Sequence, residues 1–183
     1  MWPWEHAALA YVLYSALTRR RGRSPGDVAT LWVLVASQLP DLIDKPLAWT
    51  FGVVHSGRML AHAPVVAVPL CVLVYWYFSR RSTPEYGVAF GVGYLSHVAG
   101  DAVGSALVGE YAYARFLLWP LVSVPVDDQE SVLGEVVDGL SPSPWLLVSG
   151  LVGVAVVGLW IADGKPGLGT FRRERSGSWR RDG

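Results

Sequence analysis

Residues 144–162 read PWLLVSGLVGVAVVGLWIA, a stretch of 19 residues without a charged side chain. A helix of about 20 apolar residues crosses the roughly 30 Å hydrocarbon core of a bilayer. This stretch therefore predicts a membrane-spanning helix in the last quarter of the chain, and it determines how the rest of the sequence is interpreted.

Four further apolar stretches precede this one, at residues 5–17, 28–39, 60–78 and 86–108. The chain of 183 residues is 52% hydrophobic and 16% charged, with a mean hydropathy of +0.34. This composition predicts an all-α fold, a polytopic membrane bundle of about five transmembrane helices over residues 1–162. A basic, disordered cytoplasmic tail is expected over 163–183. The alternative is an unusually apolar soluble bundle.

Most of the basic residues occur in three groups, at 19–23, 80–81 and 172–181. These groups follow the first, third and fifth predicted helices, so they fall on one side of the membrane. The positive-inside rule makes that side cytoplasmic and puts the N-terminus outside. The formal net charge is zero, which gives no electrostatic support for nucleic-acid binding.

The polar side chains within this apolar sequence are gathered in four short motifs. In the predicted topology all four fall on the extracytoplasmic side, and neutral imidazole and carboxylate are the ligand types that Zn²⁺ takes. The motifs predict one shared site, and their polar residues are His6, Asp41, Asp44, Arg58, His62, His97 and Asp101.

Spacing supports this interpretation in two motifs. His97 and Asp101 are four residues apart, so a helix places them on one face, where they can share a metal ion. Asp41 and Asp44 lie between two prolines, which end the second helix and start a turn or short helix. The alternatives are a His–Asp hydrogen bond that holds two helices together, and a capping role for the aspartates.

Arg58 and His62 are also four residues apart, and we expect them on one face at the start of the third helix. Guanidinium binds phosphate in a bidentate manner, which suits an anionic substrate, although Arg58 can equally snorkel to lipid headgroups. His55 lies in the preceding loop, where it can be solvated. Residues 115–125 are expected to form a short helix at the membrane surface, before an acidic loop that contains Asp127 and Asp128.

The order of these motifs resembles the YdjM-type family over about residues 4–125. The matching pattern is an early His, then PDLID at 40–44, GRMLAH at 57–62, SHVAGD at 96–101 and LLWPL at 117–121. Family members are described as membrane-bound, metal-dependent hydrolases. The resemblance also suggests a distant kinship with helical zinc-dependent phospholipase C and P1-type nucleases.

By position, the resemblance implies five metal ligands, with Asp44 and Arg58 in supporting roles. The implied ligands are His6, Asp41, His62, His97 and Asp101. Many relatives carry a His where Gly57 stands here, and hydroxyl-bearing neighbours of the next His are replaced by Ala61 and Ala63.

Together these features predict a multi-pass cell-membrane protein that uses a divalent metal, Zn²⁺, to hydrolyse an ester or phosphoester at the extracytoplasmic face. Asp44 is expected to accept the proton of the attacking water, and Arg58 to neutralise developing negative charge. The expected partners are the lipid bilayer and a lipid or phosphoester substrate, with no nucleic acid. The alternative is a non-catalytic metal-binding or ion-transporting membrane protein, whose polar groups would line an ion path.

The topology gives the first testable prediction. A reporter fused after Gly183 should be cytoplasmic, because the arginine groups keep that side inside, and a reporter inserted near Asp128 should be external. Alkaline phosphatase and fluorescent-protein fusions measure the two positions. The reverse pattern would remove the basis for an outward-facing site.

Overall fold

The structure, a computed structural model, describes residues 2–126, 131, 134, 137 and 140–170, and within them it is all helical. The acidic residues Asp127 and Asp128, discussed above, lie outside the described residues. The helices are α1 (Pro3–Arg20), α2 (Asp27–Ala36), α3 (Leu39–Lys45), a π-helical turn η1 (Pro46–Thr50), α4 (Pro64–Ser79), α5 (Pro84–Leu107), a 3₁₀ helix η2 (Tyr111–Leu118) and α7 (Pro144–Ala162). The predicted all-α fold is confirmed.

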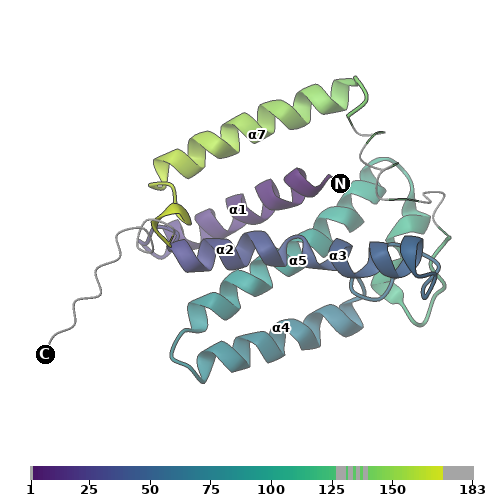
Figure 1. The fold of residues 1–183 in the computed structure, drawn as a ribbon, viewed down its shortest axis with the longest axis horizontal. Helices are drawn as coiled ribbons and strands as arrows, with labels where there is room; N and C mark the ends of the chain where they lie inside the picture. The colour runs from purple at the N-terminus through teal and green to yellow at the C-terminus, as the bar shows by residue number, and fades with distance from the viewer. Residues whose placement is uncertain (1, 127–130, 132–133, 135–136, 138–139, 171–183) are drawn as a thin grey trace, which may run out of the picture.

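Helix α5 is the centre of the bundle, because α1, α2, α4 and η2 all pack against it. The long helices run side by side in alternating directions, and α7 lies against α1 on the outside (Figure 1). The start of α1 and the end of α7 therefore lie at opposite ends of the molecule. This alternation is the one that the sequence predicts for a chain that repeatedly crosses a bilayer.

Proline marks where these helices begin. A proline occupies one of the first two positions of α1, α3, α4, α5 and α7. These positions favour proline because its fixed φ suits the first turn and its missing N–H has no partner there anyway. Pro40 starts α3 directly after α2, which breaks the second apolar stretch before Asp41. The short helix expected between Pro40 and Pro46 is therefore present.

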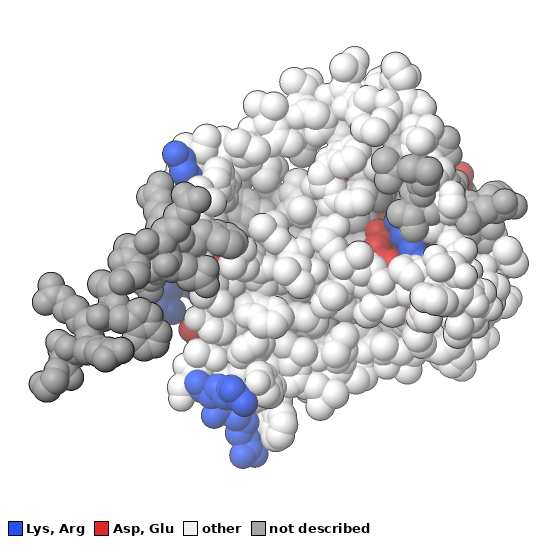
Figure 2. All heavy atoms as spheres, in the orientation of Figure 1, with Lys and Arg blue, Asp and Glu red and all other residues white. Residues whose placement is uncertain are grey.

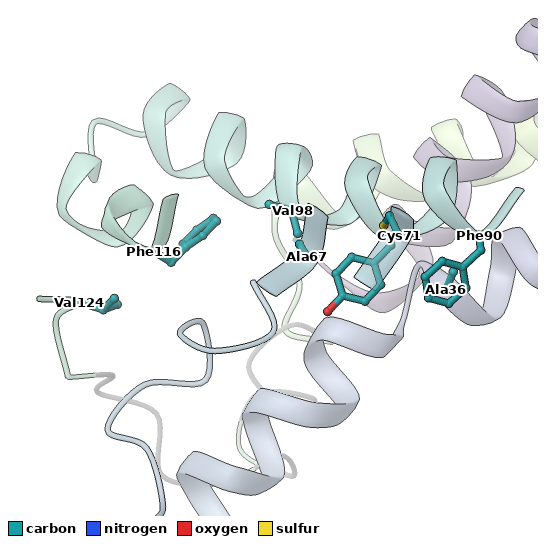
Figure 3. Close-up of a cluster of buried hydrophobic side chains, with 8 residues drawn as sticks. Ala36, Ala67, Cys71, Phe90, Val98, Phe116 and Val124 are labelled. Carbon is teal, nitrogen blue, oxygen red and sulfur yellow. The ribbon is translucent and has the colours of Figure 1, made fainter. Parts of the chain in front are cut away.

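A cluster of buried side chains joins α5 to α4 and α2. Phe90 and Tyr94 from α5 meet Cys71 from α4 and Ala36 from α2 (Figure 3). The same cluster continues toward Phe116 of η2 at the other end of the view. Small residues on the facing helices let the backbones approach closely, as is common in helix packing within membranes.

One described helix, α7, is long and apolar enough to cross a membrane alone, with a mean hydropathy of 2.2 over a window that is only 6% buried. Helix α4 is apolar but shorter. Basic side chains gather at the end of the molecule where α4 turns into α5, and the long surface between the two ends is almost uncharged in this view (Figure 2). An uncharged, apolar surface of this kind suits a lipid environment.

Polar contacts attach α7 to α1 at both of its ends. Near its start, the Trp4 indole N–H donates to Ser149 Oγ at 2.7 Å. Just past its end, Asp163 accepts from Tyr11 and Ser15, both at 2.7 Å, and pairs with Arg19. Burial alone would raise the pKa of Asp163, but these donors hold the pKa below its ordinary value.

The segment after α7 folds back instead of leaving the bundle. Asp27, at the start of α2, accepts hydrogen bonds from the backbone N–H groups of Gly167 and Gly169, at 2.7 and 3.3 Å. Ordered structure therefore extends through the first eight residues of the segment predicted as a disordered tail. The remainder, 171–183, lies outside the described residues.

The close approach of α5 to α2 gives the second prediction. A Cβ at Gly93 would collide with the carbonyl oxygen of Val33 and come within 3.0 Å of the Ala36 Cβ, whereas a Cβ at Gly91 would meet nothing within 4 Å. Gly93→Ala should therefore lower the free energy of unfolding by about 1–3 kcal/mol. Gly91→Ala, two residues away on the same helix, should be neutral or slightly stabilising.

Thermal unfolding in detergent, followed by circular dichroism, compares the two variants with the parent chain. Equal melting temperatures for both alanine variants would contradict the packing of α5 on α2 described above.

Candidate metal centre

Six buried polar side chains meet at the end of the bundle where α1 begins. They come from α1, α3, α5 and the loop that precedes α4, and they are His6, Asp41, Asp44, His62, His97 and Asp101. The convergence expected from sequence is therefore present in the fold. Each of these six residues is at most 9% exposed, so they are surrounded by one another and by neighbouring protein atoms instead of water.

Four of the six residues form a group that could hold a metal ion: Asp41, His62, His97 and Asp101 each offer one atom, and the four atoms lie within 4.8 Å of one another. The two imidazole Nε2 atoms are 3.0 Å apart. His62 Nε2 lies 3.5 Å from Asp41 Oδ1 and from Asp101 Oδ2, and His97 Nε2 lies 3.7 Å from the same two oxygens.

These spacings match a tetrahedral cation site. Ligands about 2.1 Å from a tetrahedral zinc ion lie roughly 3.4 Å from one another, close to the five separations given above. Asp41 Oδ1 is buried and has no hydrogen-bond partner in the described structure. A buried carboxylate oxygen without a partner is costly, and a cation between the four atoms would remove that cost. Two carboxylates and two imidazoles are also a donor set that Zn²⁺ accepts.

Asp44 holds His62 in place. Its carboxylate accepts from the backbone N–H groups of Met59, Ala61 and His62, at 2.9–3.2 Å, and from His62 Nδ1–H at 2.9 Å. With Nδ1 donating to Asp44, His62 turns Nε2 toward the other ligand atoms, which is how carboxylates orient metal-binding histidines. Asp44 is fully buried and saturated by these donors.

The backbone around His62 differs from the prediction. Arg58 and His62 were expected on one face at the start of a helix, but residues 51–63 form turns and α4 begins at Pro64. Pro64 occupies the first helical position, and Ala63 before it is extended. Arg58 and His62 reach the cluster because Asp44 holds the backbone of this loop by hydrogen bonds. Helical spacing does not place them there. Tyr94 adds a further constraint by donating to the Ala61 carbonyl at 2.8 Å.

His97 is oriented by α2. Its Nδ1–H donates to the Ser37 carbonyl at 2.6 Å, which leaves Nε2 facing His62. The helical spacing to Asp101 acts as expected, since both residues point to the same side of α5. His6 stacks on His97, with ring centroids 3.6 Å apart, and its Nε2 lies 3.3 Å from Asp101 Oδ1. His6 is therefore adjacent to the four-atom group without being part of it.

Each of the two carboxylates is paired with one cation, Lys45 on the far oxygen of Asp41 and Arg58 on the Asp101 oxygen that also faces the imidazoles. Lys45 Nζ lies 2.9 Å from Asp41 Oδ2, and Arg58 Nε lies 3.0 Å from Asp101 Oδ2. Sequence reasoning missed Lys45, although its spacing of four from Asp41 on a short helix was a usable signal. Arg58 is 27% exposed, so it is the part of this cluster that reaches solvent.

The carboxylates of the cluster and the basic side chains beside them shift each other's pKa values. Burial alone would lower the pKa of His62, but the carboxylates of Asp101, Asp41 and Asp44 raise that pKa to about 10. Burial would likewise raise the pKa of Asp41, but His62, His97 and the Lys45 ammonium hold it well below its usual range. The negative charge that raises the pKa of His62 would also attract a metal cation to this position.

His55 does not join the cluster. Its Nε2–H donates to the Val124 carbonyl at 3.0 Å, which ties the loop before α4 to the segment after η2. Phe116 of η2 packs edge-on against the His62 ring, with centroids 5.6 Å apart. Helix η2 ends at Leu118, so the short helix expected over 115–125 begins earlier and is shorter than predicted.

The chain was compared with known proteins once this geometry was established. The family model described as "YdjM inner membrane protein" matches residues 1–163. None of the curated proteins matches the chain, and none of the solved structures does.

The hydrogen bonds of Asp44 give the third prediction. Asp44→Asn replaces one accepting oxygen by an amide that cannot accept, so at least one buried N–H loses its partner. The free energy of unfolding should fall by about 1–3 kcal/mol even in metal-free protein. Thermal unfolding after treatment with a chelator measures it, and Glu110→Gln on the exposed start of η2 serves as the control. An Asp44→Asn protein as stable as the parent would contradict the positioning role.

Proposed function

This chain belongs to the YdjM inner membrane protein family, and we propose that it is a multi-pass, metal-dependent hydrolase. In this proposal the bundle crosses the membrane about five times, with the N-terminus outside. One divalent ion, Zn²⁺, lies between Asp41, His62, His97 and Asp101. The substrate carries an ester or phosphoester bond and is reached at the extracytoplasmic face.

The observation that carries the proposal is the set of separations among the four ligand atoms. Five of them lie between 3.0 and 3.7 Å, close to the spacing of roughly 3.4 Å between ligand atoms around a tetrahedral zinc ion. Asp44 and the Ser37 carbonyl hold the two imidazoles from behind. Such supporting hydrogen bonds are typical of metal-binding histidines.

A divalent ion bound here would act as a Lewis acid that makes water more acidic and polarises a substrate oxygen. The charge of the surrounding residues suits that chemistry. Asp41 is offset by Lys45, and Asp101 is offset by Arg58, so the ion's own positive charge stays available for an anionic substrate. Arg58 is partly exposed and can also bind a substrate oxygen by a charge-assisted hydrogen bond.

The proton acceptor is the part of the mechanism that the geometry revises. Asp44 was expected to take the proton of water, but its oxygens already accept from three backbone N–H groups and from His62. We assign it to positioning. His6 has two buried ring nitrogens without hydrogen bonds among the described residues, and it stands beside Asp101, so it is the better-placed acceptor.

The two ends of the bundle support the proposed orientation. His6 is near the start of α1, at the end that holds the cluster, and Arg19 and Arg20 are at its other end. Arg80 and Arg81 follow α4, which runs from the cluster end to that same arginine end (Figure 1). The positive-inside rule then makes the arginine end cytoplasmic and the cluster end external.

One observation favours the non-catalytic alternative. Within the described part of the chain the cluster is almost completely buried, and Arg58, at 27% exposed, is the side chain around it that is most accessible to solvent. A site closed in this way could hold a metal that joins the helices without performing hydrolysis. Ion transport has less support, because the buried His and Asp side chains of the cluster lie at one end of the bundle and do not continue along it.

Metal content gives the fourth prediction. His62→Ala and His97→Ala should each lower the metal content of the detergent-purified protein from about one ion per chain to a small fraction. Asp101→Asn should lower metal affinity by at least about 10-fold. His55→Gln is the matched control, since His55 lies on the same loop as His62 and should keep its metal. Elemental analysis of the four variants makes the comparison, and equal metal loss in the control would place the ion elsewhere.

Activity gives the fifth prediction. The zinc-loaded protein is tested on a panel of phosphomonoesters, phosphodiesters, carboxyl esters and phospholipids. It should hydrolyse at least one of these four classes. Arg58→Gln should lower kcat/KM on that substrate by about 100-fold, because it removes a charge-assisted contact, while metal content stays the same. No turnover of any class by the metal-loaded protein would favour the non-catalytic alternative.

A further inference from the structure

A cavity with several charged lining residues lies at the end of the molecule opposite the metal centre. It has a volume of about 400 Å³ and is formed where α1 ends, α2 begins and α5 begins (Figure 1). Cavities of this size accommodate small ligands or headgroups. Its polar lining includes Tyr14, Arg21, Arg23 and Glu85, none of which has a role in the proposed hydrolysis.

The cavity is lined by positively and negatively charged side chains that do not form ion pairs with each other. Arg21 and Arg23 lie on the α1–α2 loop, and Glu85 lies in the first turn of α5. None of the three makes a salt bridge within the part of the chain that the structure describes. Asp27, which also lines the cavity, is already engaged by the backbone N–H groups of Gly167 and Gly169. The lining of the cavity therefore includes two guanidinium groups from the α1–α2 loop and one carboxylate from the start of α5, all on exposed side chains.

Tyr14 provides a second, independent observation. Its side chain is only 4% exposed and lines the cavity, and its hydroxyl has no hydrogen-bond partner among the described residues. A hydroxyl that lines a cavity and makes no protein hydrogen bond is available to donate to a ligand or to water. Thr18 and Tyr86 lie beside it in the same lining.

We propose that this cavity binds a phosphoethanolamine group. Arg21 and Arg23 bind the phosphate, Glu85 binds the ammonium, and Tyr14 donates to a phosphate oxygen. Guanidinium is well suited to phosphate, and a carboxylate is the natural partner of an ammonium group. The ligand carries one charge of each sign on a short linker, and the cavity lining carries both signs, with the arginines on the α1–α2 loop and Glu85 on α5. The same chemistry is offered by a phosphatidylethanolamine headgroup and by free phosphoethanolamine.

The position of the cavity favours the lipid as the source. It lies at the end of the bundle that carries Arg19, Arg20, Arg80 and Arg81, where the proposed topology places the headgroups of the cytoplasmic leaflet. The binding itself does not rest on the metal centre or on hydrolysis, and it would stand if the proposed function failed.

Native mass spectrometry of the full-length, detergent-purified protein tests the proposal with two lipids of identical acyl chains. Phosphatidylethanolamine should be retained at least about threefold better than phosphatidylglycerol, which has a phosphate but no amine. In a second arm, isothermal titration measures binding of soluble O-phosphoethanolamine. Retention of the lipid assigns the headgroup as the source, and binding of the soluble compound without lipid retention assigns the free phosphoester.

Three variants separate the contacts. Arg21→Gln with Arg23→Gln should lower affinity for phosphatidylethanolamine by about 10-fold or more, because two charge-assisted bonds are lost. Glu85→Gln should abolish the preference over phosphatidylglycerol while leaving phosphate binding. Arg80→Gln is the control, since Arg80 lies at the same end but packs over the Trp76 ring outside the cavity, and it should change nothing. Melting temperatures confirm that each variant is folded.

The proposal is overturned if neither the lipid nor soluble phosphoethanolamine binds the parent protein. It is also overturned if Arg80→Gln weakens binding as much as the double variant, since the arginines would then act only through their general positive charge.

Discussion

Two buried carboxylates, Asp41 and Asp101, face two imidazole nitrogens across a space of less than 4 Å, and the rest of the molecule is arranged around that contact. Such a group is unstable in an apolar interior unless positive charge and hydrogen bonds compensate it. Lys45 and Arg58 supply part of that charge through their ion pairs with the two carboxylates. In the proposed function a divalent ion supplies the remainder.

The fold meets this requirement by giving each imidazole a fixed support. Helix α3 is a separate short helix with Pro40 in its first turn, and it brings Asp44 under the loop that carries His62. Helix α5 carries His97 and approaches α2 closely enough, through Gly93, for the Ser37 carbonyl to accept from His97. Packing of the bundle and orientation of the ligands thus depend on the same few contacts.

Much of this arrangement could be predicted from the sequence, and the limits have physical causes. Hydropathy and proline positions predicted the helices, since both act locally, and residues 144–162 were placed with their bounds as observed in α7. The shared cluster followed from the scarcity of polar residues. The loop before α4 was not predictable, because it is held by Asp44 through backbone N–H groups that leave no trace in residue types. The hydrogen bond from His97 to the Ser37 carbonyl could not be predicted either, because it also uses a backbone group. Lys45 was visible as a spacing, but its burial depends on the tertiary packing.

X-ray absorption spectroscopy at the metal edge of the zinc-loaded, detergent-purified protein tests the central claim most directly, because it reports the ligands themselves. The account predicts four nitrogen or oxygen ligands at about 2.0–2.1 Å, with the outer-shell scattering of two imidazoles, and no sulfur. Loss of one imidazole contribution in His97→Ala would assign that ligand to α5. Six oxygen ligands without imidazole scattering, or a sulfur ligand from Cys71, would contradict a site made by Asp41, His62, His97 and Asp101.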